Sequence, residues 1–142
     1  MKKALSLLLI MVLVTTFTWG SKKAKAPKAK KGAVESTAKG FKIDGDKVIF
    51  IFDPKDYPAG FEPPESAQVA GEFNGWDPGA ADWKMELKNG VFYLETTKAK
   101  APSGVKFKFV ADNDWQQPDP DKAGKENLAD DGYGGFNLIL KY

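Results

Sequence analysis

The sequence predicts an all-β fold, and three observations support that prediction. Aromatic residues make up 13% of the chain, and 14 glycines and 9 prolines divide it at short intervals. Aromatic residues favour strands, whereas frequent Gly and Pro favour turns over long helices. Apolar residues occur in short runs bounded by turn residues, without helical spacing. The 142 residues leave room for one hydrophobic core of ordinary size.

The N-terminal residues are predicted to be a targeting segment outside that core. Lys2 and Lys3 precede the almost wholly apolar stretch Ala4–Val14. This stretch is too short for a membrane-spanning helix, which needs about 20 apolar residues. Residues 1–20 therefore have the pattern of a cleaved secretory signal, which predicts a periplasmic or secreted protein that meets the membrane only in transit. A permanent membrane anchor is the alternative.

Residues 21–40 are predicted to form a Lys-rich linker without fixed structure. Ser21–Lys31 places six lysines among Ala and Pro, with no periodic apolar residues to bury. Such a segment is either a solvated tether or a contact with an anionic surface. The folded domain is expected to begin near Phe41 and to extend to residue 142.

Charge and composition exclude several functional classes. Residues 1–40 contain nine Lys and one acidic residue, whereas residues 41–142 contain twelve Lys and eighteen acidic residues, a balance of −6. A nucleic-acid-binding domain needs a concentrated positive face, so the acidic domain argues against that partner. The chain has no Cys, His or Arg. It therefore lacks thiol nucleophiles, imidazole bases, the usual zinc ligands and bidentate phosphate clamps.

About seven short strands are expected along the domain. They cover Phe41–Ile43, Lys47–Phe52, Ser66–Glu72, Lys84–Lys88, Val91–Thr97, Val105–Ala111 and Asn137–Tyr142. Asp44-Gly45-Asp46 and Asn89-Gly90 are turn sequences, and the second is the strongest hairpin signal in the chain. Seven short strands at this spacing, with no long helical pattern, predict a two-sheet sandwich of the immunoglobulin kind.

Alternation along the strands predicts which side chains enter the core. Phe107 and Phe109 occupy alternate positions of one strand and are expected to be buried, with Lys106 and Lys108 on the opposite face. Trp83 alternates with Met85 and Leu87, so it is expected to be a core residue.

Two other tryptophans follow polar turn residues. Trp76 ends the segment Val-Ala-Gly-Glu-Phe-Asn-Gly-Trp, and Trp115 ends Lys-Phe-Lys-Phe-Val-Ala-Asp-Asn-Asp-Trp. Together with the closing Gly-Tyr-Gly-Gly-Phe-Asn, these segments resemble the family 48 carbohydrate-binding modules. That family includes the glycogen-binding domain of the AMP-activated protein kinase beta subunit and the early-set domains that precede isoamylases and branching enzymes. The resemblance extends from about Phe41 to the C-terminus and is sharpest over Val69–Tyr142.

The resemblance implies a sugar-binding site. In that family two tryptophans stack on glucose rings, and these correspond to Trp76 and Trp115. A lysine and an asparagine that bond sugar hydroxyls correspond to Lys108 and Asn137, and a bulky residue that presses into the glucan helix corresponds to Tyr133. Gly135 departs from the pattern, because glycogen-binding members can carry a hydroxyl side chain there.

Each of these residues also has a purely structural interpretation. Trp76 and Trp115 could belong to the core, although their positions after polar turns favour exposed binding surfaces. Lys108 could be a solvated strand lysine, Asn137 could satisfy backbone at a strand start, and Tyr133 could cover the core edge.

Acidic residues near the C-terminus offer two further alternatives. They include Asp112, Asp114, Asp119, Asp121, Asp130 and Asp131. A glycosidase needs two carboxylates facing each other across a cleft, which a domain of this size rarely encloses. A calcium site is conceivable, but the loop lacks the glycine and the terminal Glu of an EF-hand. We expect these residues to form turns, with no catalytic residue, no metal site and no cofactor.

The sequence therefore predicts an exported, monomeric, non-catalytic protein that binds an α-glucan polysaccharide or a maltooligosaccharide. The alternative from another class is a structural or protein-interaction domain that docks a partner by a sheet edge. An enzyme is the third possibility.

Overall fold

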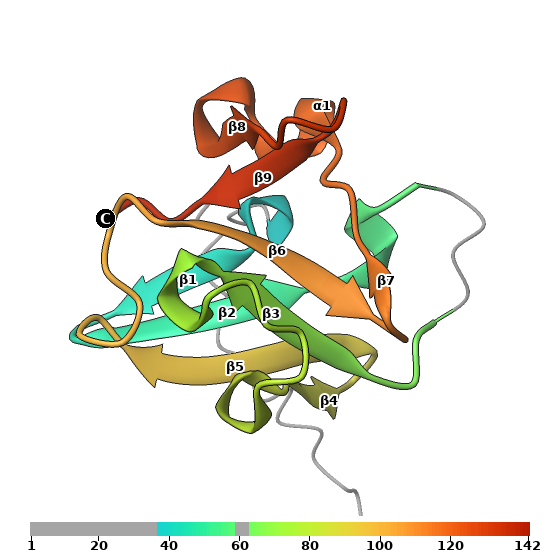
Figure 1. The fold of residues 1–142 in the computed structure, drawn as a ribbon. Coiled ribbons are helices and arrows are strands. Elements are labelled where there is room, and N and C mark those ends of the chain that lie inside the picture. The colour runs from blue at the N-terminus through green and yellow to red at the C-terminus, as the bar shows by residue number, and fades with distance from the viewer. Residues whose placement is uncertain (1–36, 59–62) are drawn as a thin grey trace, which may run out of the picture. The chain divides into compact units, whose positions relative to one another are not determined.

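Two antiparallel sheets pack face to face around a core that is rich in phenylalanine (Figure 1). The computed structural model describes residues 37–58 and 63–142. Across the two sheets the ring centroids of Phe50 and Phe107 lie 5.0 Å apart, and those of Phe52 and Phe109 lie 5.3 Å apart. All four side chains are fully buried. The predicted all-β sandwich of the immunoglobulin kind is confirmed.

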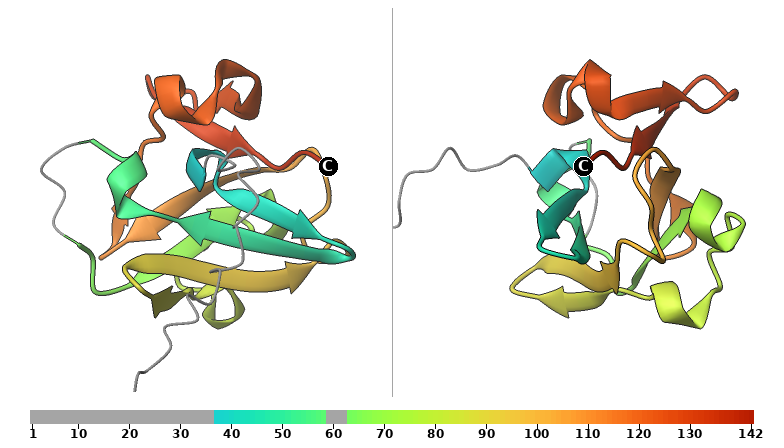
Figure 2. Two further views of the ribbon diagram at one scale, coloured as in Figure 1. Left: turned by 180° about the vertical axis from the view of Figure 1, so that it is seen from behind. Right: turned by 90° about the vertical axis from the view of Figure 1, so that its left-hand side faces the viewer.

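In each sheet, four strands are hydrogen-bonded to one another in sequence across the sheet. The strand order is β1-β2-β5-β4 in the first sheet and β3-β6-β9-β8 in the second, with β7 also paired to β6. The first sheet comprises β1 (Phe41–Asp44), β2 (Lys47–Phe52), β4 (Glu86–Lys88) and β5 (Val91–Thr97). The second comprises β3 (Ala67–Gly71), β6 (Lys106–Ala111), β7 (Asp114–Trp115), β8 (Leu128–Asp130) and β9 (Phe136–Ile139). Seen from the side, β1, β2 and β5 lie across from β3 and β6 (Figure 2).

All seven predicted strands are present, although β9 ends at Ile139, before the predicted end. Two strands and one short α-helix were not predicted: β7, β8 and α1 (Pro120–Ala123). Strands of two or three residues are too short to show an alternating pattern. The helical turn α1 does follow a local rule, because the Asp119 side chain accepts a hydrogen bond from the Asp121 N–H and Pro120 starts the turn.

The central strand β6 has the predicted inward and outward faces, but its outward face is covered by neighbouring segments. Phe107 and Phe109 are buried as expected. On the other face Lys108 is only 5% exposed and Val110 only 1% exposed. Val110 lies opposite Trp115 of β7, and Lys108 is covered by the loop before β9. The alternative in which Lys108 is a solvated strand lysine is therefore wrong, because neighbouring segments cover this face of the sheet.

Trp83 belongs to the core, as predicted, but its neighbourhood differs from the prediction. Its ring stacks on Phe73 at a centroid distance of 4.1 Å and meets Phe50 edge to face. Met85 is buried too, whereas Leu87 is 53% exposed. Leu87 lies in β4, a three-residue strand at the sheet edge whose residues are all exposed. Its predicted inward position is therefore wrong.

The described part of the chain includes residues before the expected domain start. Thr37–Lys39 form a 3₁₀ turn, in which Ala38 is buried. Gly40 packs so closely that a Cβ atom there would lie 2.9 Å from side-chain atoms of Leu138 and Phe109. The folded unit thus includes the last four residues assigned to the linker. The predicted signal segment and the rest of the linker lie outside the described residues.

Truncation of the central core ring should strongly destabilise the fold. Phe50→Ala removes a fully buried ring that contacts Phe73, Trp83 and Phe107, and should lower the free energy of unfolding by about 3–5 kcal/mol. Leu87→Ala, at the exposed sheet edge, should change it by less than about 0.5 kcal/mol. Urea denaturation followed by tryptophan fluorescence measures both values. Equal losses for the two variants would contradict this description of the core.

Candidate functional site

The turn after β3 holds Trp76 in an unusual backbone conformation. The Asn74 side chain accepts a hydrogen bond from the Gly71 N–H and donates one to the Val69 carbonyl, both at 3.0 Å. The Trp76 N–H donates to the Gly71 carbonyl at 2.9 Å. Gly75 and Trp76 are consecutive left-handed residues, with φ of 67° and 61°. This conformation is common for glycine but rare for tryptophan, so the turn holds the indole in place at a conformational cost.

A second tight turn positions Trp115. Asp112 and Asn113 have φ of 48° and 68°, so β6 reverses directly into β7. Two consecutive residues of positive φ fit the twist of a two-residue hairpin. The Asp112 carboxylate accepts hydrogen bonds from the backbone N–H groups of Glu65 and Ser66. Although partial desolvation acts in the opposite direction, these donors hold the pKa of Asp112 below its usual value.

The two turns bring Trp76 and Trp115 together. Their ring centroids lie 6.4 Å apart, and their planes meet at 48°. Trp115 is 44% exposed, and Trp76 is half-buried. Both indoles line the same surface groove, which has a volume of about 700 Å³. The pair therefore forms an angled aromatic surface at the groove, outside the core.

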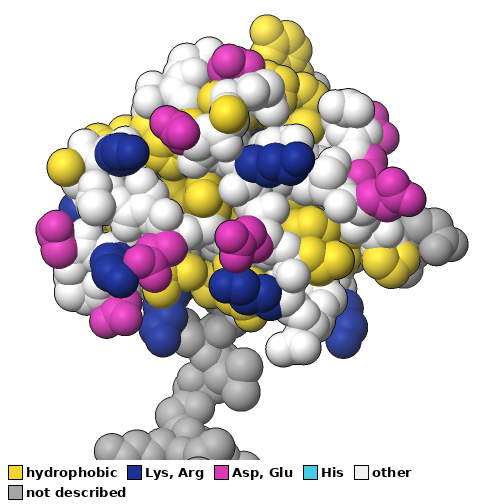
Figure 3. Space-filling view, turned by 90° about the horizontal axis from the view of Figure 1, so that it is seen from below, with side chains coloured by type: hydrophobic (Ala, Val, Ile, Leu, Met, Phe, Trp, Pro, Cys, Tyr) yellow, Lys and Arg dark blue, Asp and Glu magenta, His cyan; other side chains and the backbone are white. Residues whose placement is uncertain are grey.

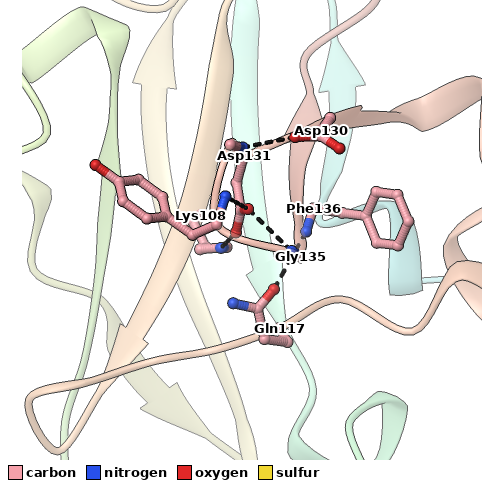
Figure 4. Close-up of polar contacts among 8 residues, drawn as sticks. Lys108, Gln117, Asp130, Asp131, Gly135 and Phe136 are labelled. Carbon is pink, nitrogen blue, oxygen red and sulfur yellow. Dashed lines mark hydrogen bonds and ion pairs between the residues drawn. The ribbon is translucent and has the colours of Figure 1, made fainter.

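Lys108 lies at the same groove and forms a buried ion pair there. Its Nζ donates to Asp131 Oδ2 at 2.7 Å, and the two side chains are only 6% and 7% exposed. The other carboxylate oxygen, Oδ1, accepts the backbone N–H groups of Tyr133 and Gly135 at 2.8 and 2.9 Å. Figure 4 shows Asp131 between Lys108 and Gly135. The lysine thus anchors the loop between β8 and β9 and is neither a solvated side chain nor an unengaged donor.

The remaining two predicted residues also line the groove. Tyr133 is 95% exposed at the tip of the anchored loop, so it does not cover the core edge. Asn137 lies in β9 opposite Ala129 and is half-buried. The fold therefore brings Trp76, Lys108, Trp115, Tyr133 and Asn137 together at one groove.

Five further polar residues line the groove, and none of them was predicted to bind sugar. They are Glu72, Lys106, Gln117, Asp130 and Asp131. Glu72 Oε2 accepts the Lys106 N–H at 2.9 Å, which links the Trp76 turn to β6. Gln117 Oε1 accepts the Phe136 N–H at 3.2 Å. No motif marked Gln117, because only the fold brings the segment after β7 beside the start of β9.

Most of the clustered aspartates form turns, as expected. Asp112, Asp119, Asp130 and Asp131 each accept backbone N–H groups. Among residues 37–58 and 63–142, no three acidic side chains lie close enough together to hold a metal ion.

Comparison with known proteins gave no match: no family model matches the chain, and neither does any curated protein. In the part of the chain that the structure describes, no helix has the length and apolar character needed to cross a membrane.

The ion pair predicts how stability changes in acid. The Lys108 side chain, and then the Tyr133 and Gly135 N–H groups, hold the pKa of Asp131 well below the ordinary value of 3.8. A carboxylate with a lowered pKa in the folded state stabilises the protein above its unfolded-state pKa, and this contribution is lost as the pH falls. Asp131→Asn should therefore melt at a lower temperature than the unchanged protein at pH 7. The difference should narrow below about pH 4.

Thermal unfolding followed by circular dichroism between pH 2 and 7 tests this expectation. Asp130→Asn removes the neighbouring exposed carboxylate and leaves the ion pair intact, so it is the matched control. Parallel pH profiles for the unchanged protein and Asp131→Asn would contradict the anchoring role.

Proposed function

We propose that this domain binds α-glucan chains without catalysis, as the family 48 carbohydrate-binding modules do. The observation that carries the proposal is the angled pair of Trp76 and Trp115 beside an exposed Tyr133 at one groove. Two turns far apart in sequence supply the pair. One of them holds its tryptophan in a strained backbone conformation, which a purely structural role would not require.

Stacking supplies enough free energy for modest affinity. The C–H faces of glucose are apolar and its rim carries hydroxyls, so flat aromatic rings with polar groups beside them match it. Burying roughly 100 Å² of apolar surface per stacked ring, at about 25 cal/mol per Å², gives about 2–3 kcal/mol before ordering costs. Two such surfaces with a few hydrogen bonds correspond to dissociation constants of about micromolar to millimolar.

The angle between the rings favours a curved chain. An α-1,4-linked glucan turns from one glucose to the next, whereas a β-1,4-linked glucan is flat and extended. Planes that meet at 48° can contact consecutive rings of a curved chain, but they cannot both lie flat on an extended one. The geometry therefore supports an α-linked ligand over cellulose.

The polar lining suits a neutral ligand with many hydroxyls. Lys106, Gln117 and Asn137 carry donors, while Glu72 and Asp130 carry acceptors. Sugar hydroxyls donate and accept, so such a mixture can serve both roles. Acidic and basic side chains lie interspersed on the face shown in Figure 3, which does not resemble the positive surface of a nucleic-acid-binding protein.

The carboxylates of the groove support a binding role over hydrolysis. A glycosidase general acid needs a raised pKa, whereas Lys108 lowers the pKa of Asp131. Glu72 already accepts a backbone N–H from β6. If the N-terminal segment directs export as proposed, the ligand is an external starch or maltodextrin.

Loss of the tryptophans should abolish glucan binding. In native gels containing amylopectin, the unchanged protein should be retarded relative to a gel without polysaccharide. Trp76→Ala and Trp115→Ala should each weaken the apparent affinity by at least about tenfold, because each removes about half of the stacking surface. The double variant should migrate as though no polysaccharide were present.

Tyr142→Ala is the matched aromatic control. Tyr142 is 44% exposed, like Trp115, but does not line the groove, so this variant should be retarded like the unchanged protein. Unchanged mobility of the original protein, or retardation that survives the double substitution, would refute the proposal. Equal retardation in gels containing hydroxyethyl cellulose would refute the preference for α-linked chains.

A further inference from the structure

Gly135 leaves a space that its neighbours fill. A Cβ atom at this position would lie 2.3 Å from Gln117 Oε1 and 2.8 Å from Asp131 Oδ2. Both distances are shorter than any ordinary contact, so a side chain at residue 135 would displace both groups. The present positions of Gln117 and Asp131 are therefore compatible with glycine at residue 135, and a larger residue there would require both side chains to shift.

The carboxamide of Gln117 is oriented by that arrangement. Its Oε1 accepts the Phe136 N–H at 3.2 Å, and only the oxygen of an amide can accept. The NH₂ group must therefore occupy the other side of the carboxamide. Figure 4 shows the nitrogen of Gln117 directed away from Gly135. Gln117 is exposed and lines the groove together with Trp115 and Tyr133. Its NH₂ donors therefore lie at the groove, on the side of the carboxamide away from Gly135.

Lys108 offers a sugar hydroxyl little exposed surface. Its ammonium group is bound to Asp131 at 2.7 Å, and the side chain is 6% exposed. The ammonium group keeps two further N–H donors, but they belong to a side chain with little exposed surface. Gln117 is an exposed neutral donor that lines the same groove.

We propose that Gln117 is a ligand-binding residue that donates a hydrogen bond to a glucan hydroxyl, and that Lys108 acts through Asp131 to position the loop. This inference rests on the proposed function. It adds a donor to the one that the family resemblance placed at Lys108, and it links Gln117 to the glycine at residue 135.

Isothermal titration calorimetry with maltoheptaose tests the inference. Gln117→Glu keeps the length and the acceptor for the Phe136 N–H but lacks the NH₂ donors, and Gln117→Ala lacks both. We expect each variant to bind at least about fivefold more weakly than the unchanged protein, because one well-oriented hydrogen bond is lost. The melting temperature of Gln117→Glu should stay close to that of the unchanged protein.

Asn89→Asp is the matched control for the added charge. Asn89 lies in the β4–β5 turn outside the groove, and Asp-Gly forms the same kind of turn as Asn-Gly. This variant should bind maltoheptaose like the unchanged protein. If it binds as weakly as Gln117→Glu, net charge explains the loss and the inference is overturned.

A double substitution tests the link to residue 135. Gly135 does not have a left-handed φ, so Gly135→Ala tests only the space around it. We expect Gly135→Ala to weaken binding by displacing Gln117, and Gln117→Ala to cause little further loss in that background. Fully additive losses would overturn the proposed coupling.

The results separate this inference from the proposed function. If the unchanged protein binds maltoheptaose and Trp76→Ala does not, but both Gln117 variants bind normally, only the role of Gln117 is refuted. If the unchanged protein does not bind at all, the proposed function fails and this inference fails with it.

Discussion

The alternation of side chains along β6 links the core to the groove. Phe107 and Phe109 face inward and meet the phenylalanines of β2, whereas Lys108 between them faces outward and anchors the loop before β9. The same strand continues through the hairpin that presents Trp115. Because successive residues of a strand point to opposite faces, packing of the core fixes where the lysine and the hairpin lie. The groove thus depends on the register of one buried strand.

Most of the fold could be predicted from the sequence, because its signals are local. Alternating phenylalanines and turn pairs such as Asn89-Gly90 mark strands and their ends without reference to the rest of the chain. The short strands β7 and β8 could not be predicted, since their pairing depends on β6 and β9. At Leu87 a local signal was misleading. The residue alternates regularly with the buried Trp83 and Met85, but its own short edge strand is exposed.

The sequence indicated which residues meet at the candidate site, but it did not indicate how they interact. The five residues that the resemblance indicates do share a groove. The ion pair of Lys108 with Asp131 was not foreseeable, because 23 residues separate the two in sequence and either alone is typical of a solvated surface. Burying two charges is costly unless further hydrogen bonds satisfy them, and the Tyr133 and Gly135 N–H groups do so here. A glycine-rich loop supplies backbone close enough for those bonds.

The left-handed backbone of Trp76 has a consequence for how this surface can evolve. A residue with a Cβ atom pays roughly 1–2 kcal/mol in that conformation, which glycine would not. Substitution by glycine would therefore relieve backbone strain while removing one aromatic wall of the groove. Selection for thermal robustness and selection for ligand capture thus act in opposite directions at this single position. A drift toward glycine there among homologous chains would mark those that have lost the ligand.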